Sequence, residues 1–194
     1  SLWRHAITTK WLGGLGVALL FAGVTTVFGL WQWDRRGQAV EEIERIETNF
    51  DQTPVGFGWL LPEGVAWSDE LRWRPVEVSG RYVTEEQLLV RTRPRSGSVG
   101  FEVVVPFVAT TGEVVLVNRG WVPTGEEQDA PDRVPAAPEG TVTVTGRLLP
   151  GEPEIAGRTA PEGQLATINL PQVADITGRG VDQRAYLSLI AESP

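Results

Sequence analysis

The first 50 residues divide into an uncharged apolar run and an amphipathic continuation. Residues 11–33, WLGGLGVALLFAGVTTVFGLWQW, contain 23 residues without a charge. As a helix they would extend about 35 Å, against a hydrocarbon core of about 30 Å. Trp11, Trp31 and Trp33 lie at the ends of the run, where interfacial aromatic residues are enriched. We therefore predict a membrane-spanning helix over residues 11–33, after a cytoplasmic tail over residues 1–10.

A cleavable signal peptide is the alternative to a membrane anchor. The apolar run is longer than a usual signal core, and no small-residue cleavage pattern precedes Trp31. An uncleaved anchor is therefore the favoured interpretation. Two basic residues on each side of the run leave the orientation nearly balanced. Residues 34–194 carry 15 basic and 25 acidic side chains, and such an acidic domain suits the outer face of the membrane.

Small residues recur at every fourth position within the predicted span. They are Gly14, Ala18, Ala22 and Thr26. Such a stripe lets a second helix approach closely, which indicates a partner in the membrane. The alternative is that glycine and alanine are simply frequent in membrane helices, and the sequence leaves both interpretations open.

The chain after the span predicts an α+β domain. Val40, Ile43 and Phe50 keep a helical spacing, so residues 34–50 predict a juxtamembrane helix that ends near Asn49. Residues 51–194 then predict an extracytoplasmic β-rich domain, a mostly antiparallel sheet or a small barrel. Its predicted strands are residues 71–82, 87–93, 101–108, 113–122, 141–149, 164–169 and 184–190. A short helix is predicted to begin near Pro171.

Composition and charge narrow the possible functions. The net charge of −8 argues against a basic surface that binds the phosphate backbone of a nucleic acid, so no nucleic-acid partner is expected. The chain has no cysteine, and its one histidine is His5, so the predicted domain has no residues for histidine-based hydrolysis or for a histidine or thiolate metal site. These absences remove most hydrolase mechanisms, and we predict no catalytic, cofactor-binding or metal-binding residue in the domain.

The strand that ends in VLVNRGWVP carries the most unusual polar positions. In an alternating strand Arg119 and Trp121 point to the same face, where the guanidinium stacks on the indole. Such a face binds a carboxylate, for example a haem propionate. The favoured alternative is that Arg119 pairs with a carboxylate of the domain and Trp121 fills the core at the end of the strand.

Six segments in a fixed order resemble the Surfeit-locus (Surf/Shy) family of cytochrome c oxidase assembly proteins. They are GLWQWDRR (29–36), VEVSGRY (76–82), LLVRTRP (88–94), GFEVVVPF (100–107), GEVVLVNRGWVP (112–123) and VTVTGRLLPGEPE (142–154). The resemblance covers nearly the whole chain. Its most specific part is the combination of WQ-x-x-R after the span with the central VLVNRGWVP.

The resemblance implies a non-catalytic assembly factor in the plasma membrane, with its N-terminus in the cytoplasm and its domain on the periplasmic side. Its partners would be cytochrome c oxidase subunits and the lipid bilayer. It would assist maturation of the haem-copper oxidase when haem a is inserted, and it could remain as an accessory subunit of the oxidase or of a respiratory supercomplex. Two alternatives stay open: a transient carrier of haem a, and an unrelated membrane-anchored envelope-binding domain.

Seven residues match the motifs of the family. They are Gln32, Arg35, Gly80, Asn118, Arg119, Gly120 and Trp121. We expect Arg119 and Trp121 to fix the end of their strand near the membrane surface, where the domain meets its anchor or an oxidase subunit. The family pattern also includes a second membrane-spanning helix with a histidine at its start. A shortened member and a second span after Pro194 are the two alternatives.

Overall fold

A computed structural model describes residues 9–127 and 129–193 of the chain. The chain divides into two compact units, residues 1–44 and residues 45–194. Helix α2 (Thr9–Asn49) contains the predicted span and the predicted juxtamembrane segment without a break. Among the described residues it is the one helix long and apolar enough to cross a membrane. The end of the helix at Asn49 confirms the prediction from spacing, while His5 and the tail before residue 9 lie outside the described residues.

The predicted small-residue stripe lies on α2. Gly14, Ala18, Ala22 and Thr26 are exposed, and the Thr26 hydroxyl donates to the Ala22 carbonyl at 2.8 Å, within its own helix. A partner helix on this stripe therefore stays a prediction.

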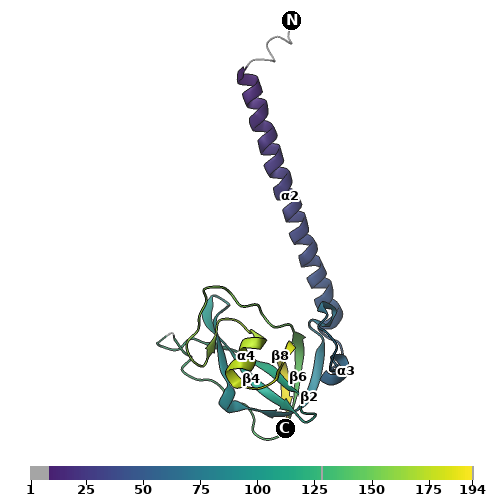
Figure 1. The fold of residues 1–194 in the computed structure, drawn as a ribbon, viewed down its shortest axis with the longest axis vertical. Helices are drawn as coiled ribbons and strands as arrows, with labels where there is room; N and C mark the ends of the chain where they lie inside the picture. Colours follow the sequence, from purple (N-terminus) through teal and green to yellow (C-terminus); the bar gives the residue numbers. More distant parts are fainter. Residues whose placement is uncertain (1–8, 128, 194) are drawn as a thin grey trace. The chain divides into compact units, whose positions relative to one another are not determined.

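Eight strands form the sheet of the second unit (Figure 1). Their bounds are β1 (Val55–Gly56), β2 (Pro75–Tyr82), β3 (Leu88–Arg95), β4 (Ser98–Ala109), β5 (Val114–Pro123), β6 (Val142–Leu149), β7 (Gln164–Leu165) and β8 (Val181–Ser193). Strands β2, β6, β8, β5 and β4 pair in that order, and β4 pairs back with β2. The structure is thus a five-stranded ring, which decides between the predicted sheet and the predicted barrel in favour of the barrel.

Gly80 is the residue that closes the ring. Residues 75–80 of β2 pair with β6, whereas residues 80–82 pair with β4. A Cβ atom at Gly80 would lie 2.1 Å from the Val108 carbonyl oxygen, so a residue with a side chain would force the two strands apart. Glycine permits this close approach of two backbones.

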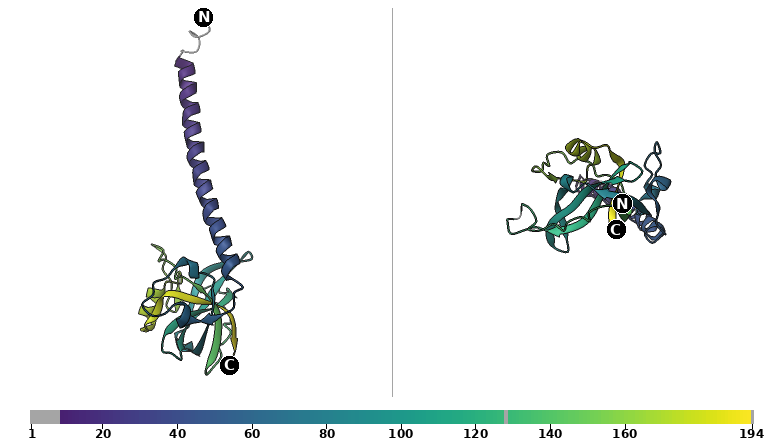
Figure 2. Two further views of the ribbon diagram at one scale, coloured as in Figure 1. Left: turned by 90° about the vertical axis from the view of Figure 1, so that its right-hand side faces the viewer. Right: turned by 90° about the horizontal axis from the view of Figure 1, so that it is seen from below.

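The alternating strands fill the barrel on the inside and build a second core on the outside. The interior core includes Val76, Val103, Phe107, Val117 and Leu187, and α3 (Phe57–Leu60) adds Phe57. The outer core lies under β7 and α4 (Leu170–Thr177) and includes Leu88, Val90, Val104, Leu116, Leu165, Ile168, Leu170 and Val173. Figures 1 and 2 show α4 and α3 beside different parts of the barrel.

The strand pairings are mostly antiparallel, and β1–β2, β3–β7 and β5–β8 are the parallel ones. The predicted α+β class is confirmed.

The strands predicted over residues 101–108 and 184–190 are longer in the structure, as β4 and β8. Other predictions were wrong where tertiary contacts replaced a local preference. Residues 71–74 are not strand: η1 (Asp69–Leu71) ends there, and Trp73 has a φ of 69°. Of residues 164–169 only Gln164 and Leu165 pair, since the chain then turns into the Asn169 cap of α4. Residues 55–60, which lie outside the predicted helix and strands, contain β1 and α3, because β1 pairs with β2. The short helix η2 (Thr84–Glu86) joins β2 to β3.

Candidate functional site

The signature residues Asn118, Arg119, Gly120 and Trp121 form a bulge near the end of β5. Asn118 pairs with Val104 and Gly120 pairs with Val103, which leaves Arg119 as an extra residue between them. Gly120 has a φ of 112°, and its N–H donates to Asn118 Oδ1 at 3.0 Å. Glycine adopts this φ readily, and a bulge of one residue changes which face the following side chains occupy.

Arg119 lies on the interior side of the bulge. Its guanidinium pairs with Glu192 of β8 at 2.8 Å and lies 5.4 Å from the ring centre of Tyr82. It also donates to the carbonyls of Pro135 and Ala136 at 2.9 and 3.2 Å. With its side chain only 9% exposed, Arg119 joins three distant parts of the chain: β2, the loop before β6 and the end of β8.

Glu192 accepts two hydrogen bonds in this interior cluster, one from Arg119 and one from the Tyr82 hydroxyl at 2.6 Å. Burial alone would raise the pKa of the Glu192 carboxyl, but these hydrogen bonds and the Arg119 charge outweigh it, so the pKa lies below its usual value. Burial, followed by the contact with Glu192, raises the pKa of the Tyr82 hydroxyl. The ionised carboxylate and the neutral phenol are therefore the forms that fit the fold.

Trp121 lies on the exterior side of the same bulge. Its indole N–H donates to the Arg93 carbonyl at 2.8 Å. A Cβ atom at Gly100 would lie 2.4 Å from the indole ring, so the missing side chain there makes room for Trp121. The ring is half-buried and holds β5 against the end of β3.

An ion-pair cluster accompanies Trp121 on this side. Arg93 contacts Glu102 at 3.0 Å and also contacts Glu152, which accepts from the Ile168 N–H at 2.8 Å. Burial raises the pKa of Glu102, the Arg93 charge opposes the shift, and the nearby Glu152 reinforces it. Two carboxylates thus share one guanidinium here, whereas Glu192 has Arg119 to itself.

The structure corrects the prediction that Arg119 and Trp121 share a face. The bulge places them on opposite sides of β5, so Arg119 lies over Tyr82 and does not stack on the indole. The alternative, that Arg119 pairs with a domain carboxylate, is confirmed. Trp121 is half-buried and contacts the Arg93 backbone at the exterior, so the interior core does not include it.

The other signature residues lie apart from this bulge. Gly80 closes the barrel beside Val108. Gln32 and Arg35 lie in the unit that ends at Glu44, both exposed on α2, where Arg35 Nη1 is 3.5 Å from Gln38 Oε1. The expected contact of Arg119 and Trp121 with the membrane anchor or an oxidase subunit stays a prediction.

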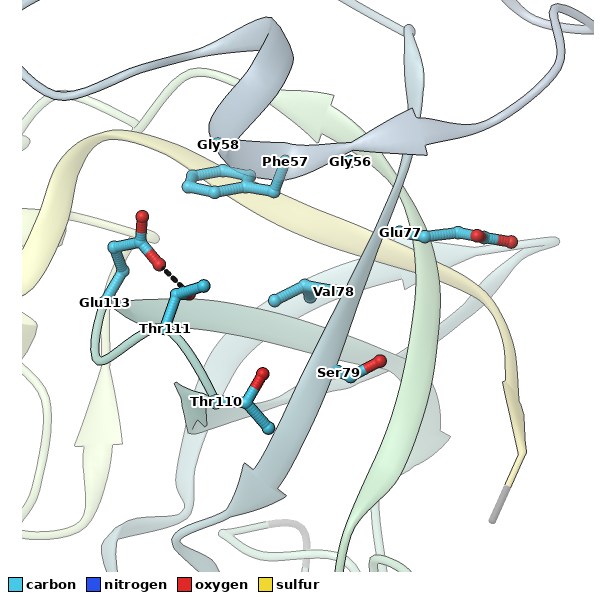
Figure 3. A pocket seen from close by; sticks show the side chains of 9 residues that line it. All are labelled: Gly56, Phe57, Gly58, Glu77, Val78, Ser79, Thr110, Thr111 and Glu113. Carbon is cyan, nitrogen blue, oxygen red and sulfur yellow. Dashed lines mark hydrogen bonds between the residues drawn. The ribbon is translucent and has the colours of Figure 1, made fainter.

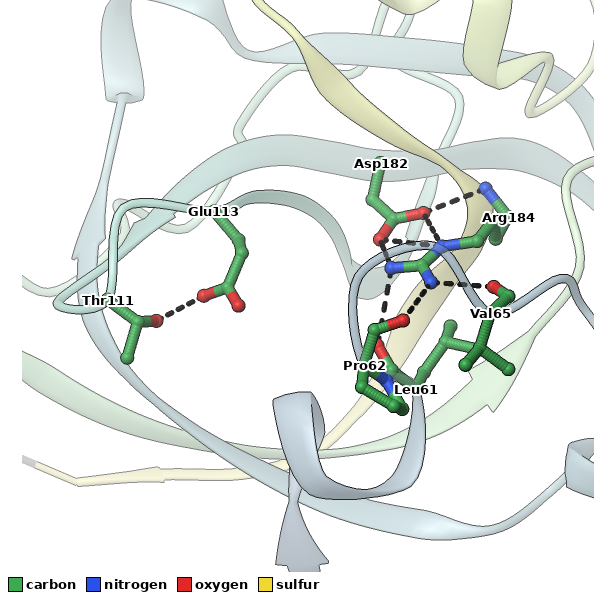
Figure 4. Close-up of polar contacts among 7 residues, drawn as sticks. All are labelled: Leu61, Pro62, Val65, Thr111, Glu113, Asp182 and Arg184. Carbon is green, nitrogen blue, oxygen red and sulfur yellow. Dashed lines mark hydrogen bonds and ion pairs between the residues drawn. The ribbon is translucent and has the colours of Figure 1, made fainter.

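Sequence reasoning missed a second arginine, Arg184 of β8. It pairs with Asp182 at 2.6 Å and donates to the carbonyls of Leu61, Pro62 and Val65 (Figure 4). Arg184 therefore fixes the segment after α3 against β8. The spacing of Asp182 and Arg184, which lie on one face of a strand, was the only available signal.

The described residues do not provide an axial ligand for haem iron. Histidine, cysteine, methionine and tyrosine are the usual ligands. The chain has no cysteine or methionine, and His5 lies outside the described residues. Its two tyrosines, Tyr82 and Tyr186, are buried, and burial raises the pKa of both hydroxyls, which opposes the phenolate that binds iron.

Comparisons with known proteins place these residues in a family. The profile of the SURF1 family matches residues 19–194. An uncharacterized SURF1-like protein of Mycobacterium tuberculosis is 35% identical over 190 residues, covering 94% of this chain and 69% of that protein. A SURF1-like protein of Monosiga brevicollis is 35% identical over 165 residues, covering 78% and 60%. The cytochrome oxidase assembly protein SHY1 of Saccharomyces cerevisiae is 29% identical over 121 residues, covering 61% of this chain and 30% of SHY1. The chain therefore belongs to the SURF1 family.

Proposed function

We propose that this chain is a membrane-anchored, non-catalytic assembly factor for cytochrome oxidase. The observation that carries the proposal is its membership of the family that includes SHY1, a protein named for cytochrome oxidase assembly. The architecture is compatible with this role. The interior of the barrel is filled with packed apolar side chains, so the surfaces of the barrel and of α2 are what the protein offers to a partner.

The finer proposal concerns the place and the stage of assembly. The barrel would lie on the outer side of the plasma membrane and act while haem a enters the oxidase. The exposed stripe of Gly14, Ala18 and Ala22 on α2 would pack against an oxidase subunit in the lipid. Because the barrel lacks an iron ligand among the described residues, we infer that it acts by contact with the oxidase rather than by holding haem iron. Retention as an accessory subunit follows if this contact outlasts assembly.

The test is to delete the gene in the source organism and restore it with a tagged copy. Loss of haem a absorbance and of assembled oxidase, both recovered by the tagged copy, is the expected result. Purification of that copy in a mild detergent should also yield oxidase subunits. Haem bound at one equivalent without oxidase subunits would favour the transient haem a carrier instead. Normal oxidase in the deletion strain would reject the assembly role.

A pair of variants separates the helix contact from membrane insertion. Gly14→Leu places a large side chain on the stripe, whereas Gly16→Leu makes the same change about 200° around the helix. Only Gly14→Leu should reduce the yield of oxidase subunits in the purification. Equal yields from the two variants would show that the stripe does not form the contact.

A further inference from the structure

A cavity of about 220 Å³ lies between α3, β2 and the turn that joins β4 to β5 (Figure 3). Two apolar side chains, Phe57 and Val78, form its buried wall. Its polar lining consists of the hydroxyl residues Ser79, Thr110 and Thr111 and the acidic residues Glu77 and Glu113. Pockets for drug-sized ligands run from about 300 to 1,000 Å³, so this cavity suits a single side chain.

One oxygen of Glu113 is available to a ligand. The Thr111 hydroxyl donates to Oε2 of Glu113. Oε1 has no hydrogen-bond donor among the residues that the structure describes, and it lies 3.5 Å from the place that a Cβ atom of Gly58 would occupy. This free oxygen therefore faces α3 across the cavity, where the absence of a side chain at Gly58 leaves room.

The charges around the cavity favour a cation. Besides the hydrogen bond with Asp182, the charges of Glu113 and Glu63 both raise the pKa of Arg184. The Arg184 guanidinium already forms an ion pair with Asp182 and donates hydrogen bonds to three backbone carbonyls. Arg184 thus fixes the segment that follows α3 and makes no direct ion pair with Glu113 (Figure 4). The other nearby arginine, Arg81, lines a separate hollow that shares Thr110. The exposed Trp59 follows Gly58 in α3.

We propose that this cavity binds one basic side chain, arginine or lysine, of a partner protein. The ammonium or guanidinium group would donate to Oε1 of Glu113 and to the hydroxyls, and the methylene stem would lie against Phe57 and Val78. A charge-assisted hydrogen bond and an aromatic wall are the features that recognise such side chains. The proposal goes beyond the proposed function and does not depend on it, because it can be tested with peptides alone.

The experiment uses the full chain in non-ionic detergent and three blocked tripeptides, Gly-Arg-Gly, Gly-Lys-Gly and the neutral isostere Gly-citrulline-Gly. Binding is followed by NMR at the Gly58 amide and the Trp59 indole. We expect saturable binding of the arginine or lysine peptide with a dissociation constant on the order of 1 mM. The citrulline peptide should bind at least about 10-fold more weakly, a free-energy difference of about 1.4 kcal/mol.

Three variants locate the binding. Glu113→Gln should weaken binding at least about 10-fold, the same factor as for citrulline. Gly58→Leu should abolish binding by filling the cavity while keeping every charge. Glu63→Gln removes a carboxylate outside the cavity and should leave binding unchanged. Equal binding of citrulline, no saturable binding of either basic peptide, or equal losses from Glu63→Gln and Glu113→Gln would overturn the proposal. If Glu113→Gln disturbs the turn between β4 and β5, the loss of binding in Gly58→Leu still tests whether the peptide occupies the cavity.

Discussion

An arginine pairs with a glutamate on both the interior and the exterior side of β5, but the pKa of the glutamate is lowered on the interior side and raised on the exterior side. On the interior side, Arg119 forms an ion pair with Glu192 alone, and the pKa of Glu192 is below its usual value. On the exterior side, Arg93 forms ion pairs with both Glu102 and Glu152, and the pKa of Glu102 is raised. Burial raises the pKa of both carboxyls. For Glu192 the hydrogen bonds from Arg119 and Tyr82 outweigh burial, whereas for Glu102 burial and the nearby Glu152 outweigh the Arg93 charge and the hydrogen bond from Asn118. An arginine beside a glutamate is therefore insufficient evidence for a strongly stabilising pair.

The two sides also differ in what they hold together. The Arg119 cluster joins elements far apart in the chain, since Glu192 lies 73 residues beyond Arg119. The Trp121 contact joins β5 to β3, the strands on either side of β4, through one side chain–backbone hydrogen bond and the space left by Gly100. We therefore expect the interior cluster to matter more for the stability of the barrel.

The largest expected effect is that of Arg119→Met, because it removes the ion-pair partner of the partly buried Glu192 carboxylate and the donor to two backbone carbonyls. We expect the free energy of unfolding to fall by about 3 kcal/mol. Urea denaturation of the full chain in detergent, followed by near-ultraviolet circular dichroism, measures it. The exposed Arg81→Met is the control and should change stability little. Adding Glu192→Met to Arg119→Met should recover part of the loss; a double variant as unstable as the single one would contradict a paired role.

Trp121→Ala tests the exterior side and should cost about 2 kcal/mol, less than a fully buried tryptophan, because the ring is half-buried. Trp121→Phe keeps the ring beside Gly100 but loses the hydrogen bond to Arg93, and should cost about 1 kcal/mol. The same denaturation assay applies. If Trp121→Ala proved more damaging than Arg119→Met, the order of importance of the two sides would be reversed.

Gly120→Ala tests the bulge that separates the two sides. A Cβ atom there meets no other atom within 4 Å, so the expected loss of about 1 kcal/mol comes only from the φ of 112°. Gly58→Ala is the control, since the φ of Gly58 is outside the positive range. A loss equal to that of the control would show that backbone strain at Gly120 is negligible.

The smallest expected effect is a difference in pH dependence. The lowered pKa of Glu192 adds stability that is present above the unfolded value of about 4.5 and is lost as the pH falls through the folded pKa. Glu192→Gln should therefore flatten the acid side of the stability curve. The raised pKa of Glu102 acts in the other direction: its contribution is present below about 4.5 and is lost as the pH rises through the folded pKa.

Glu102→Gln should accordingly become more stable relative to wild type as the pH rises above about 4.5, the usual pKa of its carboxyl. Unfolding free energies measured from pH 3 to 8 would show the two opposite slopes. Parallel slopes for Glu102→Gln and Glu192→Gln would mean that the two carboxylates do not differ as their surroundings indicate.

Much of the fold could be predicted from the sequence because it depends on local periodicity. The uncharged run at residues 11–33 and the spacing up to Asn49 predicted α2, and alternation with valine-rich runs predicted most strands. The same alternation wrongly predicted that the side chains of Arg119 and Trp121 lie on one face of β5. One extra residue in β5 reverses the faces beyond it. A glycine inside a strand such as VNRGW is compatible with a bulge, but also with a close backbone approach, so the sequence alone does not fix the register beyond it.

The sequence by itself determined an apolar helix, an α+β domain of mostly antiparallel strands and the signature of the SURF1 family. Those properties follow from residue order alone. The tertiary structure decided that the strands close into a ring at Gly80, that Arg119 serves Glu192, and that Glu113 faces a cavity beside Gly58. Each of these depends on residues brought together from distant positions, and the energy of such a contact depends on burial and on shared partners that no local pattern records.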